Sequence, residues 1–152
     1  MFKKILVCLD GSSFSEQVLR YASEEATASS KKLVLLHVVM LPVVTPVGIP
    51  GDAANIAPML PTPEQIVADE TKAKTYLNKK AKSLEEMGID TECVVIAGNP
   101  GTTIVDYAEK NDIDLIAIAT HGRSGIKRMI FGSVAEYVLR NSKLPILLIR
   151  PK

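Results

Sequence analysis

The sequence contains little cysteine and little histidine, and this scarcity argues against several kinds of site. Its 152 residues include two cysteines and two histidines. Cys8 and Cys93 lie far apart, each inside an apolar run, as is typical of buried free thiols in a reducing compartment. His37 and His121 are not accompanied by a Cys-x-x-Cys or His-Glu-x-x-His spacing. The pattern therefore favours structural or solvent-facing roles for both histidines over metal binding.

A strong net charge and long apolar runs are also missing. Eighteen Lys and Arg residues against seventeen Asp and Glu leave a formal net charge of +1, which gives no electrostatic footprint for nucleic acid. No apolar run approaches the roughly 20 residues of a membrane span. The run in the opening "MFKKILVCLD" is too short for a secretion signal, and Asp10 interrupts it. We therefore expect a cytoplasmic protein that binds neither membranes nor nucleic acid.

Three common catalytic and nucleotide-binding motifs are absent as well. The chain has no Walker A spacing, and "GNPGTT" (Gly98–Thr103) matches that motif only in part. No Gly-x-Gly-x-x-Gly follows the first apolar run, and there is no nucleophile elbow on which a hydrolase triad would depend. These absences argue against a P-loop enzyme, a dinucleotide-binding dehydrogenase and an α/β-hydrolase.

Five short apolar runs, rich in Val, Ile and Leu, divide the chain at regular intervals. They are nearly continuous rather than alternating, as strands covered on both faces of a parallel sheet usually are. The predicted strands are Lys4–Leu9, Lys32–Val39, Glu92–Ala97, Asp114–Ala119 and Pro145–Arg150.

Four helical patterns separate these strands, at Ser13–Ser29, Thr62–Gly88, Gly101–Asn111 and Gly132–Ser142. Capping boxes are predicted at the first helix and at the last one, with Ser13 and Ser133 as the N-caps. The inner faces are predicted from residues spaced three or four apart. They comprise Phe14, Val18, Ala22 and Ala26; Ile66, Ala73, Leu77, Ala81 and Leu84; and Ile104, Val105 and Ala108.

The alternation of strands and helices predicts one α/β domain over residues 1–152. We expect a five-stranded parallel sheet in the order 3-2-1-4-5 with helices on both faces, a Rossmann-like fold. Ligands in such folds bind between the first and fourth strands, beyond their carboxyl ends. The loops Cys8–Ser13 and Ala119–Val134 are both predicted to meet at that crevice.

The segment Met40–Thr62 does not fit the alternation. It holds five of the nine prolines and neither Lys nor Arg. Connections of this length are uncommon inside a domain and often serve as lids or binding loops. We expect this loop to close over the site, or over a neighbouring subunit, when a nucleotide is bound.

The stretch "ATHGRSGIKRMIFGSV" has the chemistry of a phosphate site. Glycines allow backbone N–H groups to approach an anion closely, and a helix N-terminus adds unpaired donors. Ser133 is either an N-cap alone or an N-cap that also donates to phosphate, while Arg123, Lys127 and Arg128 would neutralise charge. A solvated basic loop before a capped helix is the alternative. Asp10 is either a ligand of ribose or adenine, or a cap on the turn that follows it.

These residues resemble the universal stress protein family, in its ATP-binding branch. The resemblance rests on "KKILVCLDGSSFSEQVLRYA", on "VLLHV", and on the run from "DLIAIATHGRSG" to "PILLIR". It covers most of the chain outside the Pro-rich segment. The phosphate motif of that branch is Gly, two residues, Gly, nine residues, Gly, then Ser or Thr. Gly122, Gly132 and Ser133 match it, whereas Ala119 stands where the first Gly is expected.

The resemblance implies the positions of an ATP site and no catalytic residue. Cys8 and Asp10 would line the adenine and ribose side, and the backbone of Val38 would bind the adenine edge. The ribose and phosphates would lie against Ala119, Gly122, Arg123, Gly125, Gly132, Ser133 and Val134.

The function implied is that of a nucleotide-dependent regulatory or stress-response protein that holds ATP with Mg²⁺ and presents a surface to an unidentified protein partner. A slow ATPase or phosphotransferase, and a dimeric stress scaffold that needs no nucleotide, are the alternatives. The last strand lies at a sheet edge in the expected order, so we also expect a homodimer through Ile146–Ile149. A monomer whose edge is covered by another segment is the alternative to that dimer.

Overall fold

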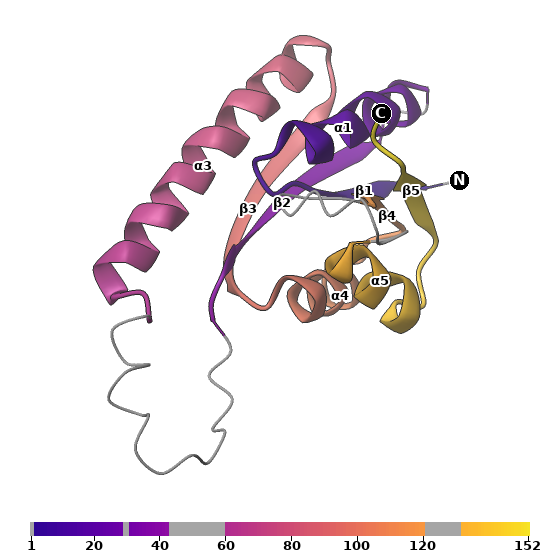
Figure 1. The fold of residues 1–152 in the computed structure, drawn as a ribbon. Coiled ribbons are helices and arrows are strands. Elements are labelled where there is room, and N and C mark those ends of the chain that lie inside the picture. Colours follow the sequence, from indigo (N-terminus) through magenta and orange to yellow (C-terminus); the bar gives the residue numbers. More distant parts are fainter. Residues whose placement is uncertain (1, 29–30, 43–59, 121–131) are drawn as a thin grey trace, which may run out of the picture.

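The computed structural model describes residues 2–28, 31–42, 60–120 and 132–152 of the chain (Figure 1). Within these ranges, helices and strands alternate as the sequence predicts. The elements are β1 (Lys4–Cys8), α1 (Ser13–Thr27), β2 (Lys32–Met40), α3 (Pro63–Glu86), β3 (Asp90–Gly98), α4 (Pro100–Lys110), β4 (Leu115–Ala119), α5 (Ser133–Asn141) and β5 (Ile146–Ile149). All neighbouring strands are parallel and the order is β3-β2-β1-β4-β5, which confirms the predicted topology.

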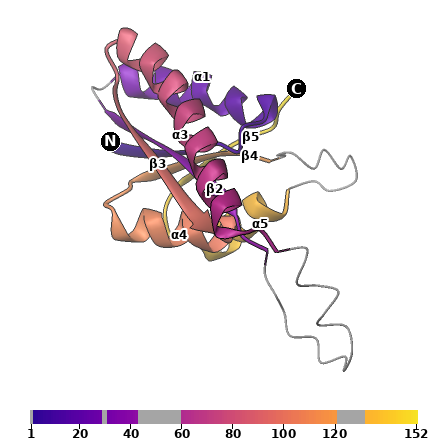
Figure 2. The same ribbon diagram turned by 90° about the vertical axis from the view of Figure 1, so that its left-hand side faces the viewer.

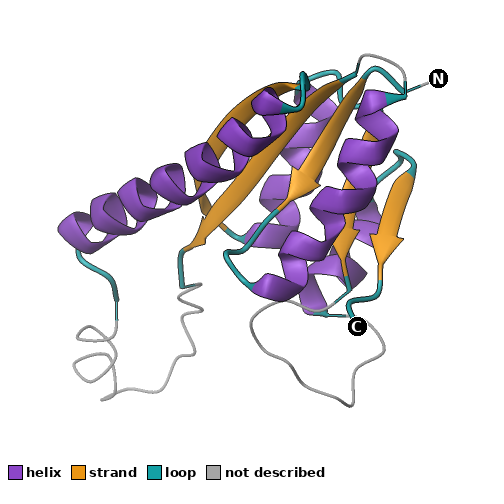
Figure 3. Cartoon of the chain, turned by 90° about the horizontal axis from the view of Figure 1, so that it is seen from above, coloured by secondary structure: helices purple, strands orange, loops and turns teal. Residues whose placement is uncertain are grey.

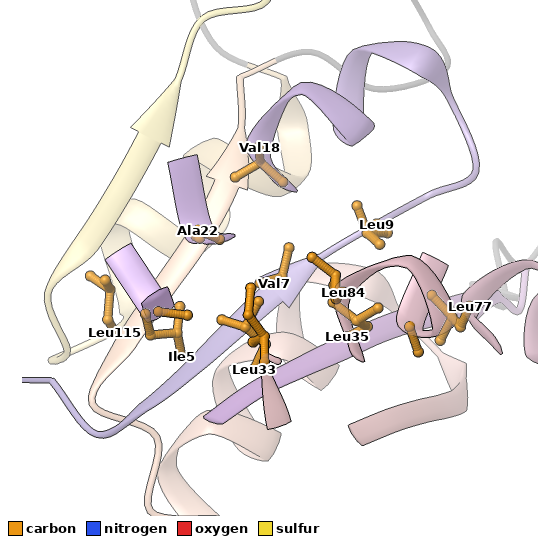
Figure 4. Close-up of a cluster of buried hydrophobic side chains, with 14 residues drawn as sticks. Ile5, Val7, Leu9, Val18, Ala22, Leu33, Leu35, Leu77, Leu84 and Leu115 are labelled. Carbon is orange, nitrogen blue, oxygen red and sulfur yellow. The ribbon is translucent and has the colours of Figure 1, made fainter. Parts of the chain in front are cut away.

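The sheet is covered by helices on both faces. Helices α1 and α3 lie on one face and α4 and α5 on the other (Figures 1 and 2). Alternate residues of each strand therefore enter two separate cores, because successive strand side chains point to opposite faces. On the first face, Val7 and Leu35 pack with Leu77 of α3 (Figure 4). This double coverage is why the apolar runs are continuous in sequence.

Helix α3 is 24 residues long; its first turn is stabilised by capping and the rest of it by packing against the sheet. Thr62 and Gln65 form a capping box around Pro63 at its start. The buried residues of the helix lie towards its other end and are Ala73, Leu77, Ala81 and Leu84, as predicted. Ile66 is only half-buried, because the first turns of α3 extend past the sheet (Figure 3).

The predicted N-cap of the first helix is wrong by one residue. Ser12, not Ser13, is the N-cap of α1, and its side chain accepts a hydrogen bond from the N–H of Ser15. The buried face consequently contains Ser15, while Phe14 is 41% exposed. Val18, Ala22 and Ala26 are buried as expected.

The predicted capping box at the last helix is also wrong. Gly132 is the N-cap of α5, and Ser133 is the first residue inside the helix. The backbone of Gly132 is extended there (φ −67°, ψ 152°), and its N–H donates to the carbonyl of Thr120. Ser133 therefore cannot cap the helix that it belongs to. None of the described helices is both long and apolar enough to cross a bilayer.

Candidate functional site

A cavity of about 590 Å³ lies at the carboxyl ends of the central strands. Its walls come from β1, β2 and β4, from the first turns of α4 and α5, and from one side of α3. This is the volume range of small-molecule sites, and the position is the one that open α/β sheets use for ligands. Seven of the predicted site residues line it: Cys8, Asp10, Val38, Ala119, Gly132, Ser133 and Val134.

The cavity exists because β1 ends before its neighbours do. The ladder between β1 and β2 stops at the pair Cys8 and Leu36, whereas β2 continues beside β3 as far as Met40. After Asp10 the chain turns away through Gly11, whose φ of +82° favours glycine. A gap is left between β2 and β4 where β1 would otherwise continue.

The backbone of Val38 faces this gap. The carbonyl of Leu36 accepts from the N–H of Leu9 on the β1 side, and the N–H of Leu41 donates to Gly98 on the β3 side. Because the direction of the N–H and C=O groups alternates along a strand, both groups of Val38 point towards the missing continuation of β1. No partner for either group is found among the described residues. The position predicted to read an adenine edge thus offers one donor and one acceptor side by side.

The backbone of Ala119 lies on the opposite wall. The N–H of Thr120 donates to Ile149 on the β5 side, so by the same alternation the N–H and C=O of Ala119 point to the β1 side. The side chain of Ala119 is 8% exposed. Ala in place of the motif's first Gly therefore leaves the main chain of this position directed at the cavity.

Asp10 belongs to the turn that starts α1. Its Oδ1 accepts from both the N–H and the Oγ of Ser12, at 2.9 and 2.6 Å. Its own N–H donates to the Oγ of Ser15, at 3.2 Å. The capping role that the sequence allowed is therefore real, and it holds the carboxylate at the rim of the cavity in a fixed position.

The N-terminus of α5 supplies hydrogen-bond donors to the same cavity. Glu136 is the first residue whose N–H bonds within the helix, to the carbonyl of Gly132. The preceding N–H groups, those of Ser133, Val134 and Ala135, have no partner among the described residues, and all three residues line the cavity. The N–H of Gly132 is not among them, because it donates to the carbonyl of Thr120. Helix N-termini that present such N–H groups bind anions in many proteins.

Cys8 lines the cavity without nucleophilic character. Its side chain is 6% exposed, and burial raises the pKa of the thiol to about 12. The thiol is therefore neutral at physiological pH, and its contribution to the site is apolar surface. Among the described residues, no group of three or more His, Cys, Asp or Glu could hold a metal ion.

Several predicted positions fall outside the described residues. Gly122, Arg123 and Gly125 lie there, together with Lys127, Arg128 and His121. Most of the Pro-rich segment does too, since residues 43–59 are not described.

One wall of the site was not predicted from the sequence. Tyr76 and Ala73 of α3 line the cavity together with His37 of β2. Ala73 was predicted as a core residue and His37 as structural or solvent-facing, while Tyr76 was not singled out. The available signal was the alternation in "LLHVV", which places His37 on the sheet face covered by α3. That helix could not be located over the strand end from sequence spacing alone.

The fold and the cavity together define an α/β protein with a ligand crevice where the strand order reverses. A model described as the universal stress protein family matches residues 1–150, and the chain belongs to that family.

Individual relatives agree with this assignment. The universal stress protein YxiE of Bacillus subtilis is 32% identical over 99% of this chain and 100% of its own length. The solved structure of MJ0577 from Methanocaldococcus jannaschii is 28% identical and superposes with a TM-score of 0.78, over 100% of this chain and 98% of that one. A universal stress protein solved in complex with cAMP is 23% identical, with a TM-score of 0.66 over 98% and 97% of the two chains.

Proposed function

We propose that this protein binds an adenine nucleotide, ATP with Mg²⁺, in the crevice, and acts in the cytoplasm as a nucleotide-dependent regulatory or stress-response protein. The observation that carries the proposal is the pairing of two sets of main-chain groups in one cavity. The N–H and C=O of Val38 match the acceptor N1 and the donor N6 of adenine. The three N–H groups at the start of α5 match phosphate oxygens. A protein of the same fold holds cAMP, so this architecture accommodates an adenine nucleotide.

Mg²⁺ would enter with the triphosphate rather than occupy a site of its own. Mg²⁺ keeps several waters and is commonly held by one or two carboxylates together with substrate phosphates. Asp10 is a carboxylate that lines the cavity, and it would be the ligand that the protein contributes. When bound, the ion would neutralise part of the phosphate charge.

Mass spectrometry of small molecules gently released from purified protein tests the proposal, followed by calorimetry with ATP, GTP and AMP. We expect an adenine nucleotide in the released fraction and a preference for ATP over GTP. A protein that releases none, and that binds none of the three when they are added, would instead favour the nucleotide-independent scaffold.

The enzymatic alternative requires a positioned base or nucleophile. Asp10 already accepts two hydrogen bonds from Ser12, as a cap on the turn that starts α1. We therefore expect ATP hydrolysis to be slow or absent. Turnover in the usual enzymatic range of roughly 1–1000 per second, abolished by Asp10→Asn with ATP binding intact, would establish the ATPase instead.

We also propose that two copies associate through β5. This strand lies at the sheet edge, and Ile146–Ile149 are all partly exposed. An exposed apolar edge offers unpaired backbone groups to a second strand. Leu147 and Leu148 pack against opposite faces of the sheet. Leu147→Lys and Leu148→Lys therefore each place a positive charge on one of these faces. Sedimentation should show a dimer that at least one of them weakens. A wild-type monomer at micromolar concentration would refute the interface.

A further inference from the structure

The crevice extends to the α3 face of the sheet, beyond the residues that the nucleotide motif uses. Val38 and Leu36 face the α4 and α5 side, where they pack with Ile104. The alternate residue His37 faces α3, where its ring lies 6.2 Å from that of Tyr76 in an edge-to-face arrangement (70°). Both rings line the same cavity as Val38 and the start of α5. The nucleotide motif assigns no role to this part of the cavity.

Tyr76 presents the carbon atoms of its ring to the cavity rather than its hydroxyl. The Oη atom is inaccessible to solvent and lies beside Glu16 and Ser15 of α1. Burial, and then the neighbouring carboxylate of Glu16, hold the pKa of the phenol above its ordinary value. The residue lines the cavity although its Oη is buried, so the surface it offers there is apolar and aromatic.

Charged side chains of α1 and α3 fix the position of the Tyr76 ring. Lys80 of α3 forms an ion pair with Glu16 of α1 at 2.7 Å, and both side chains are largely buried (27% and 30% exposed). The Lys80 Nζ also lies 5.7 Å from the centre of the Tyr76 ring, within the range of a cation–π contact. A side chain fixed in this way is a preformed surface, which costs little entropy when a ligand packs against it.

A planar base that bonds to both backbone groups of Val38 must lie edge-on to β2. Its two faces then turn towards the two helical layers, since the hydrogen-bonding direction of a strand lies in the plane of the sheet. We propose that the α3 layer supplies one of the two contact surfaces for the base. In this proposal Tyr76 is the residue that packs against the base, and Ala73 leaves the space beside it. The inference rests on the proposed function and adds residues to its base-binding end.

Calorimetry with adenosine, inorganic tripolyphosphate and ATP tests this, because it measures binding at the base end and at the phosphate end of the site separately. Contact between an aromatic side chain and a base contributes about 1–3 kcal/mol by alanine substitution, or about five- to 150-fold in affinity. Tyr76→Ala should weaken adenosine and ATP by that factor and leave tripolyphosphate unchanged. Tyr76→Phe should bind as the wild type does, because the hydroxyl does not reach the cavity. Tyr21→Ala, an exposed tyrosine on α1, is the matched control and should change none of the three affinities.

Two further measurements make the outcome independent of how well Tyr76→Ala folds. Ala73→Leu fills the space beside the ring and should also weaken adenosine but not tripolyphosphate. In the wild type, nuclear Overhauser effects should connect the adenine protons with the ring protons of Tyr76.

The possible failures are distinguishable. A wild type that binds neither adenosine nor ATP refutes the proposed function and this inference with it. A wild type that binds both, with Tyr76→Ala and Ala73→Leu unaffected, refutes this inference alone. Equal loss of adenosine and tripolyphosphate in Tyr76→Ala would mean that the ring only supports the fold.

Discussion

Ser133→Pro should separate the fold of α5 from its proposed function as an anion site. Ser133 is the first residue of the helix, where proline is well tolerated because that N–H has no helical partner. Gly132 before it has the extended backbone that a following proline requires (φ −67°, ψ 152°). We therefore expect the free energy of unfolding to change by less than about 1 kcal/mol.

Ligand binding should change far more than stability. The substitution removes an N–H and a hydroxyl from the cavity wall, and a hydrogen bond to a charged group contributes about 1.5–3 kcal/mol. Ser133→Ala removes the hydroxyl alone, which predicts a loss of about ten- to 150-fold if that group contacts phosphate. Ser133→Pro should lose at least as much, and up to about 10⁴-fold if the two bonds add.

The assay is calorimetry with ATP and tripolyphosphate, beside urea unfolding of each variant. Ser13→Pro is the matched control: it occupies the same first position in α1, after an equally extended N-cap (φ −85°, ψ 152°), and does not line the cavity. It should bind as the wild type does. A folded Ser133→Pro protein with unchanged affinity for tripolyphosphate would refute the anion site at α5. A loss of several kcal/mol of stability would refute the assigned helix start.

Three predictions concern stability and are measured by urea unfolding. Leu77→Ala should cost about 2–5 kcal/mol, because this side chain is fully buried between α3 and the sheet; a smaller loss would contradict the packing of α3. Gly101→Ala would place a Cβ 2.7 Å from the ring of Tyr137, and should cost about 1–3 kcal/mol where α4 meets α5; an unchanged midpoint would show that the ring moves freely. Two main-chain N–H groups at the start of β1 donate to Asp114 and hold the pKa of its carboxyl below the ordinary value. The ionised Asp114 side chain therefore stabilises the fold above a pH of about 4, and this stabilisation is lost as the pH falls through the lowered pKa. Asp114→Asn should consequently make the free energy of unfolding less sensitive to acid. An identical pH profile would refute this role.

The strand order was predictable because each strand is buried on both faces, which leaves continuous apolar runs in the sequence. The starts of the helices were harder to predict from the sequence. Ser12 and Ser13 are adjacent hydroxyl residues, and only the turn through Gly11 determines which of them caps α1. At α5 the decisive contact is the hydrogen bond from Gly132 to Thr120, which depends on how the end of β4 lies beside the helix.

The candidate site was predictable where it consists of loops that follow central strands. Asp10 and Ser133 were placed at the crevice from the topology alone, and both line it. Tyr76 was not, because its place at the crevice depends on how a 24-residue helix lies across the ends of the strands. That arrangement is set by packing between residues distant in sequence, such as Leu77 with Leu35.

The early end of β1 has a consequence for how the site tolerates mutation. The two groups of Val38 that face the gap belong to the main chain, so exchanging the side chain for another residue that suits a strand leaves them in place. Proline alone would delete the N–H. Descendants of this sequence could therefore drift at position 38 without losing the donor and acceptor. Their persistence would depend on β1 stopping at Cys8, and an extension of that strand through Leu9 and Asp10 would pair with these groups and close the site.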